Sequence, residues 1–89
     1  MNNVQITMLG KPGCHLCDDA RAIIMDVLSS FNRPESISFE ERSILEDEQL
    51  YERYWEEIPV ILINDQVHDF WRVNPDRLSA AITRVLDAE

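Results

Sequence analysis

Two cysteines separated by two residues are the side chains of this sequence best suited to chemistry. They are Cys14 and Cys17, in the segment Cys14-His15-Leu16-Cys17, and the 89-residue chain has no other cysteine. The thiolate form of cysteine is a strong nucleophile, and a close pair can exchange between a dithiol and a disulfide. The pair therefore predicts thiol–disulfide exchange, in which one sulfur attacks a substrate disulfide and the other resolves the mixed product.

A metal site is the first alternative for such a pair. Structural zinc needs about four ligands, and the only histidines are His15 and His68. Because His15 lies inside the cysteine loop itself, redox chemistry is favoured over zinc. Two other interpretations stay open: a carrier that binds zinc or copper(I) at Cys14 and Cys17, and a protein-binding module whose cysteines do not turn over.

The cysteines lie between a predicted strand and a predicted helix. Residues 4–9 alternate and are rich in strand formers, and the breaker cluster 10–13 follows them. Apolar residues then recur at helical spacing from Leu16 to Phe31. On a helical wheel Cys17 falls inside the apolar arc and Cys14 outside it. We therefore expect Cys14 to be exposed and Cys17 to be covered.

The rest of the chain predicts three further strands and two further helices. The strands are expected over Ile37–Arg42, Val60–Ile63 and Val67–Trp71, one helix over Leu45–Trp55 after a Ser43–Glu46 capping box, and a last helix from Asn74-Pro75. The order β-α-β-α-β-β-α predicts a single α/β domain over residues 1–89. The first β-α-β unit should be parallel and the last two strands an antiparallel hairpin, in a four-stranded mixed sheet with helices on both faces.

Cys14 is expected at the start of the first helix, where unpaired N–H groups and the helix dipole favour a thiolate. Lys11, the only lysine, and Arg21 add positive charge, whereas the aspartates 18–19 oppose a thiolate. His15 can donate a hydrogen bond to the site.

Composition limits the partners. Seventeen acidic residues against eight basic ones give a formal charge of −9, which argues against nucleic acid and against an anionic membrane surface. The longest apolar run, Val60–Ile63, is far too short to span a membrane. We expect a cytoplasmic monomer.

Together, Leu9–Ala20 and Ile58-Pro59-Val60-Ile61 resemble the glutaredoxin and thioredoxin superfamily, and more closely the small bacterial glutaredoxin-like proteins. The resemblance implies a thioredoxin-like fold with sheet order 2-1-3-4. It also implies that Pro59 is cis and lies beside Cys14, and that the backbone at Ile58 pairs with a bound disulfide. The implied activity is that of a disulfide oxidoreductase in electron transport and cell redox homeostasis, with Cys14 and Cys17 as the catalytic pair.

The same resemblance suggests what the site would bind. Lys11 matches the basic residue with which glutaredoxins hold a glutathione carboxylate, so glutathione is a possible co-substrate, with no bound cofactor and no metal. The substrate would be a disulfide-containing protein or a glutathione mixed disulfide. The predicted substrate-binding residues are Lys11, His15, Ile58 and Pro59. The Gly-Gly turn typical of glutaredoxins is replaced here by Phe70-Trp71-Arg72-Val73.

Several other residues have two interpretations. Core and rim packing is favoured over a substrate groove for five aromatic residues: Tyr51, Tyr54, Trp55, Phe70 and Trp71. Arg42 and Arg72 are expected to pair with acids, and His68 to face solvent from an edge strand.

Overall fold

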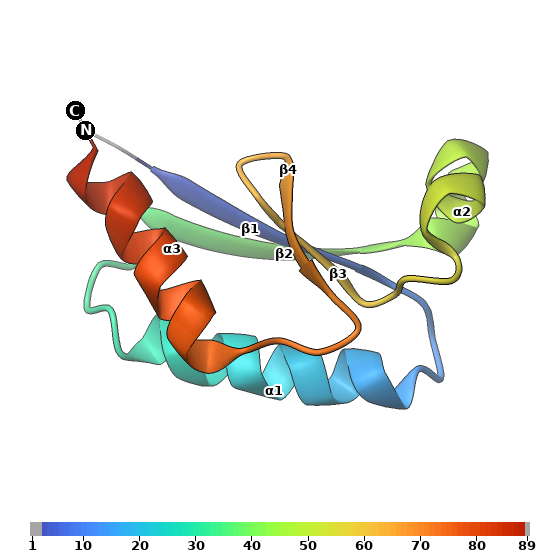
Figure 1. Ribbon diagram of the computed structural model, residues 1–89, viewed down its shortest axis with the longest axis horizontal. Helices are drawn as coiled ribbons and strands as arrows, with labels where there is room; N and C mark the ends of the chain where they lie inside the picture. Colours follow the sequence, from blue (N-terminus) through green and yellow to red (C-terminus); the bar gives the residue numbers. More distant parts are fainter. Residues whose placement is uncertain (1–2, 89) are drawn as a thin grey trace.

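A computed structural model describes residues 3–88 of the chain (Figure 1). Its elements are β1 (Val4–Gly10), α1 (His15–Ser29), β2 (Ile37–Ser43), the 3-10 helix η1 (Ile44–Glu46), α2 (Glu48–Tyr54), β3 (Val60–Ile63), β4 (Gln66–Phe70) and α3 (Pro75–Asp87). The predicted order of strands and α-helices is confirmed.

The strands form one mixed sheet in the order β2-β1-β3-β4. β1 and β2 are parallel, with Val4 opposite Ile37. β3 runs antiparallel to β1 and pairs Val60 with Leu9, and β4 returns antiparallel to β3. This is the predicted sheet order. It places the start of β3 beside the end of β1, which leads into the cysteine loop.

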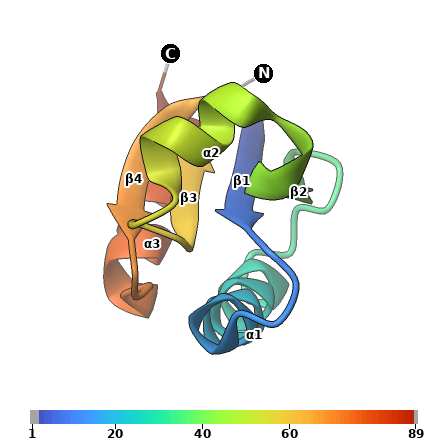
Figure 2. The same ribbon diagram turned by 90° about the vertical axis from the view of Figure 1, so that its right-hand side faces the viewer.

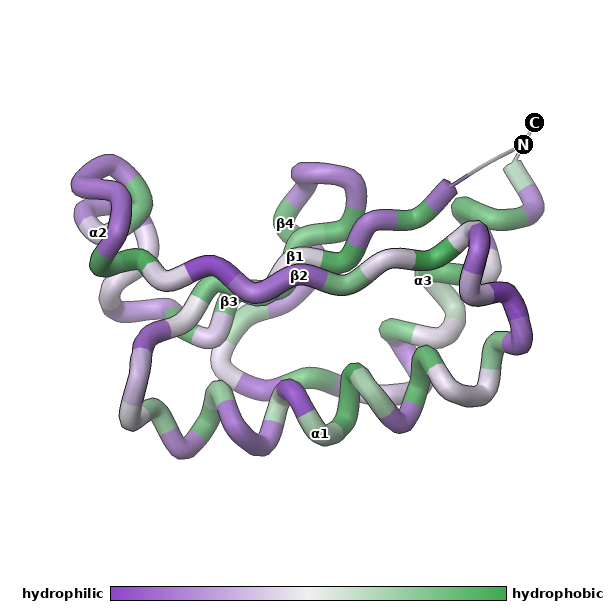
Figure 3. Tube along the Cα trace, turned by 180° about the vertical axis from the view of Figure 1, so that it is seen from behind, coloured by the Kyte–Doolittle hydropathy of each residue, from purple (hydrophilic) through white to green (hydrophobic). Residues whose placement is uncertain are grey.

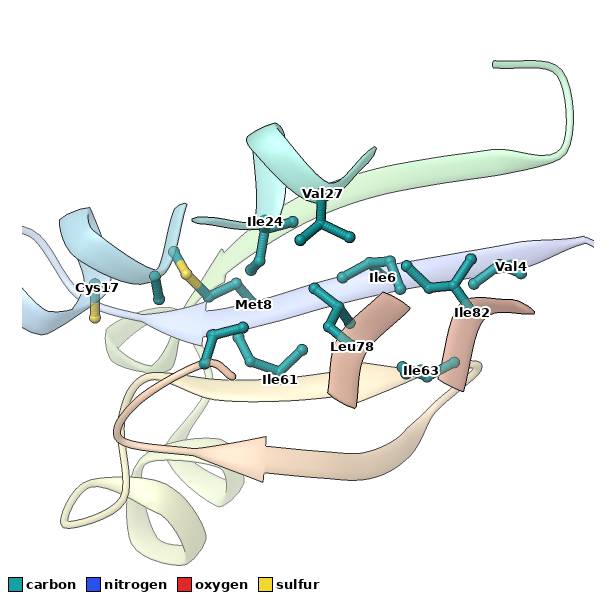
Figure 4. Packing of buried hydrophobic residues seen from close by; sticks show 12 residues of the cluster. Val4, Ile6, Met8, Cys17, Ile24, Val27, Ile61, Ile63, Leu78 and Ile82 are labelled. Atoms are coloured by element: carbon teal, nitrogen blue, oxygen red, sulfur yellow. The ribbon is translucent and has the colours of Figure 1, made fainter. Parts of the chain in front are cut away.

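The two faces of the sheet are covered unequally. α1 and α3 lie together on one face, over the larger hydrophobic cluster (Figure 1). In this cluster the buried residues form a row with Cys17 at one end and Val4 and Ile63 at the other (Figure 4). α2 covers one end of the opposite face (Figure 2), where Leu50 and Tyr54 pack against a smaller cluster. Helices therefore lie on both faces, as predicted.

The predicted helix over Leu45–Trp55 is two shorter helices. The Ser43 hydroxyl accepts a hydrogen bond from the Leu45 amide at 3.1 Å and caps η1. Asp47 is extended, and its carboxylate accepts from the amide of Gln49 at 2.9 Å to begin α2. The prediction was wrong because it assumed a single helix cap at Ser43, whereas the segment has a second cap at Asp47.

The hairpin turn is also one residue shorter than expected. Asn64 and Asp65 have φ values of 49° and 68°, the left-handed conformation of a two-residue hairpin turn. Gln66 is already part of β4, so this strand ends at Phe70 and leaves Trp71 outside it.

The edge strand β2 is hydrophilic along its second half, as Figure 3 shows from behind. Glu40, Glu41 and Arg42 are exposed there, and charges at such an edge discourage pairing with another sheet. Within residues 3–88, no helix combines the length and the apolar character that crossing a membrane would require.

The expectation that His68 faces solvent from an edge strand is wrong. This residue is half-buried, and its Nε2 atom is buried without a hydrogen-bond partner among the described residues. It lines a cavity of about 330 Å³ between β4 and α3, together with Arg84. Burial lowers the pKa of His68, with Arg77 acting in the same sense and Asp69 in the opposite one.

This burial predicts a pH-dependent stability. Below about pH 6.5 the unfolded chain binds a proton at His68 more readily than the folded protein does. The free energy of unfolding therefore decreases as the pH is lowered. Urea unfolding at about pH 7.5 and about pH 5.5 should therefore show a larger loss for the wild type than for His68→Gln. The variant keeps the neighbouring charged residues Asp69, Arg77 and Arg84, so the two proteins differ only at His68. Equal losses of unfolding free energy would therefore contradict the prediction.

Candidate redox site

The two cysteines occupy the junction between the β1–α1 loop and α1. They are joined in a disulfide, with 5.2 Å between their Cα atoms. Cys14 is the N-cap of α1: its backbone is extended, and its sulfur accepts a hydrogen bond from the Cys17 amide at 3.1 Å. The sulfur thus takes the place that a serine or aspartate oxygen usually fills, and faces the unpaired donors of the helix start.

The two sulfurs differ in exposure. Cys17 is 1% exposed and belongs to the large hydrophobic cluster, whereas Cys14 is half-buried at its margin. The asymmetry predicted from the helical wheel is confirmed. A reactant from solvent can therefore reach Cys14 before Cys17. His15, the first residue of α1, is exposed beside it.

Gly10 makes a contact that sequence reasoning missed. A Cβ atom at this position would lie 2.7 Å from the sulfur of Cys17, so no larger residue fits without displacing one of them. The available signal was a glycine at the end of a strand, which often marks a close approach. Gly13 has a different role, because its φ of 79° is one that other residues seldom adopt.

The segment before β3 lies at the same end of the sheet. The pairing of Leu9 with Val60 places Pro59 across from Gly10. The Ile58–Pro59 bond is cis, as the resemblance implied, although spacing alone favoured a simple helix stop. Pro59 is buried and Ile58 touches both hydrophobic clusters. Within residues 3–88, the N–H and C=O of Ile58 form no hydrogen bond with the protein.

Lys11 is exposed and lines a cavity of about 310 Å³ on the β2 side of the site, together with Cys17, Arg21 and Arg42. Arg21 donates to the two carboxylate oxygens of Glu41 at 2.8 and 2.7 Å. Hydrogen bonds to Glu41 and then to Asp18 raise the pKa of Arg21. Its charge is thus largely compensated, so Lys11 is the better source of positive charge near the cysteines.

The expected ion pairs of Arg42 and Arg72 are absent from the described part of the chain. The salt bridges found there belong to Arg21 and Arg77. No group of three or more histidine, cysteine, aspartate or glutamate side chains in that part is placed to hold a metal ion.

The five aromatic residues, for which core and rim packing was favoured over a substrate groove, lie mostly at the surface. Tyr54 is half-buried against the smaller cluster, but the side chains of the other four are 40–53% exposed: Phe70, Tyr51, Trp55 and Trp71. Trp71 has a φ of 66°. Its amide donates to the carbonyl oxygens of Pro59 at 2.9 Å and Glu57 at 3.3 Å. The segment before β3 is therefore bonded to the end of β4.

The sheet order and the cysteine pair at the start of α1 define a thioredoxin-fold protein of the glutaredoxin-like type. The family model described as "Glutaredoxin-like domain (DUF836)" matches residues 5–83. The chain belongs to this family. No curated protein sequence matches it.

Solved structures agree on the fold. The solution structure of protein Ne2328 from Nitrosomonas europaea is 21% identical, covers 91% of this chain and 93% of its own, and gives a TM-score of 0.74. Protein XcR50 from X. campestris is 23% identical over 88% of this chain and 95% of its own, with a TM-score of 0.66. Thioredoxin from Malassezia sympodialis, at 19% identity, covers 94% of this chain and 76% of its own, with a TM-score of 0.66.

Proposed function

We propose that this protein is a dithiol disulfide oxidoreductase, with Cys14 as the nucleophile and Cys17 as the resolving thiol. The observation that supports the proposal is the difference in exposure between the two disulfide-bonded cysteines. Cys14 is half-exposed and caps α1, and Cys17 is buried behind it. Thiolates are favoured at helix starts, and exposure decides which sulfur a substrate meets first.

The proposed reaction starts from the reduced pair. The Cys14 thiolate attacks a substrate disulfide, a mixed disulfide forms, and one substrate sulfur leaves as a thiolate. Cys17 then loses its proton and attacks the Cys14 sulfur, which releases the second substrate thiolate. The substrate gains two electrons and the pair becomes the Cys14–Cys17 disulfide. An external thiol, glutathione or a protein dithiol, must reduce this disulfide before the next cycle.

Four residues would place the substrate. Among the described residues, the backbone N–H and C=O of Ile58 have no hydrogen-bond partner, and they lie at the same end of the sheet as the cysteines, which suits pairing with an extended substrate. Pro59 fixes this segment, and Lys11 and His15 are exposed polar groups of the cysteine loop. The proposed setting is a cytoplasmic monomer in redox homeostasis, acting on protein disulfides or glutathione mixed disulfides, without nucleic-acid or membrane partners.

A redox titration against glutathione buffers tests the proposal. Alkylation followed by intact mass measures the dithiol, the disulfide and any glutathione adduct. We expect the wild type to show one reversible two-electron transition. Cys17→Ser should form a glutathione adduct, on Cys14, whereas Cys14→Ser should form no adduct. If no transition occurs at any accessible potential, the enzyme assignment is wrong, and a binding module without redox turnover is the better description.

A further inference from the structure

We propose that a groove beside the redox pair binds an apolar side chain of a polypeptide substrate, and that Leu16 and Trp71 determine this preference. The inference rests on the proposed function and narrows its substrate. The groove has a volume of about 420 Å³ and lies between α1 and the connection from β4 to α3. Its apolar walls are formed by Leu16, Ala20, Ala22, Ile23, Trp71 and Val73. We call it the Leu16–Trp71 groove.

Leu16 lies between the two cysteines in sequence and has no place in the core. The helical pattern predicted an inward-facing residue, yet Leu16 belongs to neither hydrophobic cluster and is only half-buried. Ile23, at the other end of the same wall, packs against the large cluster. The structure thus leaves an apolar side chain of the groove wall uncovered between the two cysteines, next to Cys17 in the sequence.

Trp71 forms the opposite wall and is held in place. Its positive φ is unusual for a residue with a side chain. Its amide donates to Pro59 and Glu57, and its indole N–H donates to the carbonyl oxygen of Glu56 at 2.8 Å. The ring is 53% exposed, with the Phe70 ring edge-on at 5.0 Å. A tryptophan held in this way presents an apolar surface without first having to be ordered.

The size and lining of the groove favour a polypeptide side chain. Its volume falls within the range of about 300–1,000 Å³ that is typical of ligand sites. Glutathione carries two carboxylates and an ammonium group. The mainly apolar walls of the groove offer few hydrogen-bond or ion-pair partners to these charged groups. An aromatic or large aliphatic residue beside a substrate cysteine would instead be covered by Leu16 and Trp71 while Cys14 reacts.

The surrounding charge favours a basic polypeptide. Asp19 lines the groove, and Glu56 and Glu57 adjoin Trp71 through its hydrogen bonds. Arg72 is the only basic residue among the described residues that line the groove, and the whole chain carries a formal charge of −9. Lysine or arginine near the apolar residue of the substrate should therefore speed association.

Matched peptides provide the test. Two short lysine-containing peptides differ only in phenylalanine or alanine next to their cysteine, and each cysteine is disulfide-bonded to thionitrobenzoate. The reduced protein attacks the peptide sulfur and releases the coloured thiolate. We expect the phenylalanine peptide to react about tenfold faster than the alanine peptide. Trp71→Gly, which suits the positive φ, and Leu16→Ala should each reduce this ratio to near one.

Trp55→Ala is the matched control. Trp55 is as exposed as Trp71, at 52%, but it stacks on Tyr51 and lies outside the groove wall. This variant should keep the tenfold ratio. A ratio near one in the wild type, or a ratio that survives both groove substitutions, would overturn the groove assignment while the redox function stands.

A second measurement separates the two proposals. If the reduced wild type reacts with neither peptide nor with a small disulfide, the redox function itself fails. The groove is then tested by titrating the phenylalanine peptide with serine in place of its cysteine. Binding should shift the NMR signals of the Trp71 indole and the Leu16 methyl groups more than those of Trp55, and the absence of such shifts would overturn the proposal.

Discussion

Replacing Cys14 with serine should lower the rate of disulfide reduction by roughly 10³-fold or more. A serine hydroxyl at this position is not a thiolate and cannot form a disulfide. Cys17→Ser should behave differently, because the exposed Cys14 thiol survives. It should still attack a small disulfide once, and then accumulate as a stable mixed disulfide for want of a resolving thiol.

Stopped-flow release of the leaving thiolate, followed by intact mass, distinguishes these outcomes. Circular dichroism checks that both variants are folded, and Cys17→Ala replaces Cys17→Ser if the buried hydroxyl disturbs the core. Full activity in Cys14→Ser would show that the nucleophile has been misassigned. A mixed disulfide found on Cys17 in the wild type would reverse the two roles.

Gly10→Ala should lower the free energy of unfolding by about 1–3 kcal/mol, the usual cost of an atom forced into a filled core. The new Cβ would lie 2.7 Å from the Cys17 sulfur, and that sulfur has no room to move because it is itself buried. Gly10 pairs with Ser43 in the sheet, where alanine is otherwise acceptable. The contact with sulfur, and not the backbone, is therefore the reason for the loss. Urea unfolding measures it.

A double-mutant cycle isolates that contact. In a Cys17→Ala background the sulfur is gone and the nearest remaining contact is the ordinary one to Cβ at 3.4 Å. There Gly10→Ala should be neutral or slightly stabilising, because alanine restricts the unfolded chain more than glycine does. The same loss in both backgrounds would contradict the assigned cause.

Most of the fold follows from local patterns. Strand alternation, the helical spacing of α1 and the Asn74-Pro75 helix start are properties of neighbouring residues, and each was placed within a residue or two. The burial of Cys17 followed from the same wheel. The sheet order and the cis bond at Pro59 came from the family resemblance, because neither is encoded in spacing.

The differences arise where distant segments meet. Leu16 lies on the apolar arc of α1, but a wheel does not tell whether a core lies opposite each turn. Arg21 is held by Glu41 of a strand twenty residues away. Trp71 is exposed, and it is bonded through its amide and its indole N–H to the segment before β3. Such contacts depend on the assembled fold, and no local pattern reveals them.

The cap at the start of α1 links the chemical state of Cys14 to the stability of the first turn of this helix. The same Cys14 sulfur that would react is the acceptor for the Cys17 amide. A bulky group attached to that sulfur must compete with this hydrogen bond, so the first turn of α1 should open more often after modification. The exchange rate of the Cys17 amide hydrogen thereby becomes a probe of the chemical state of Cys14, readable one residue at a time while the rest of the helix remains protected.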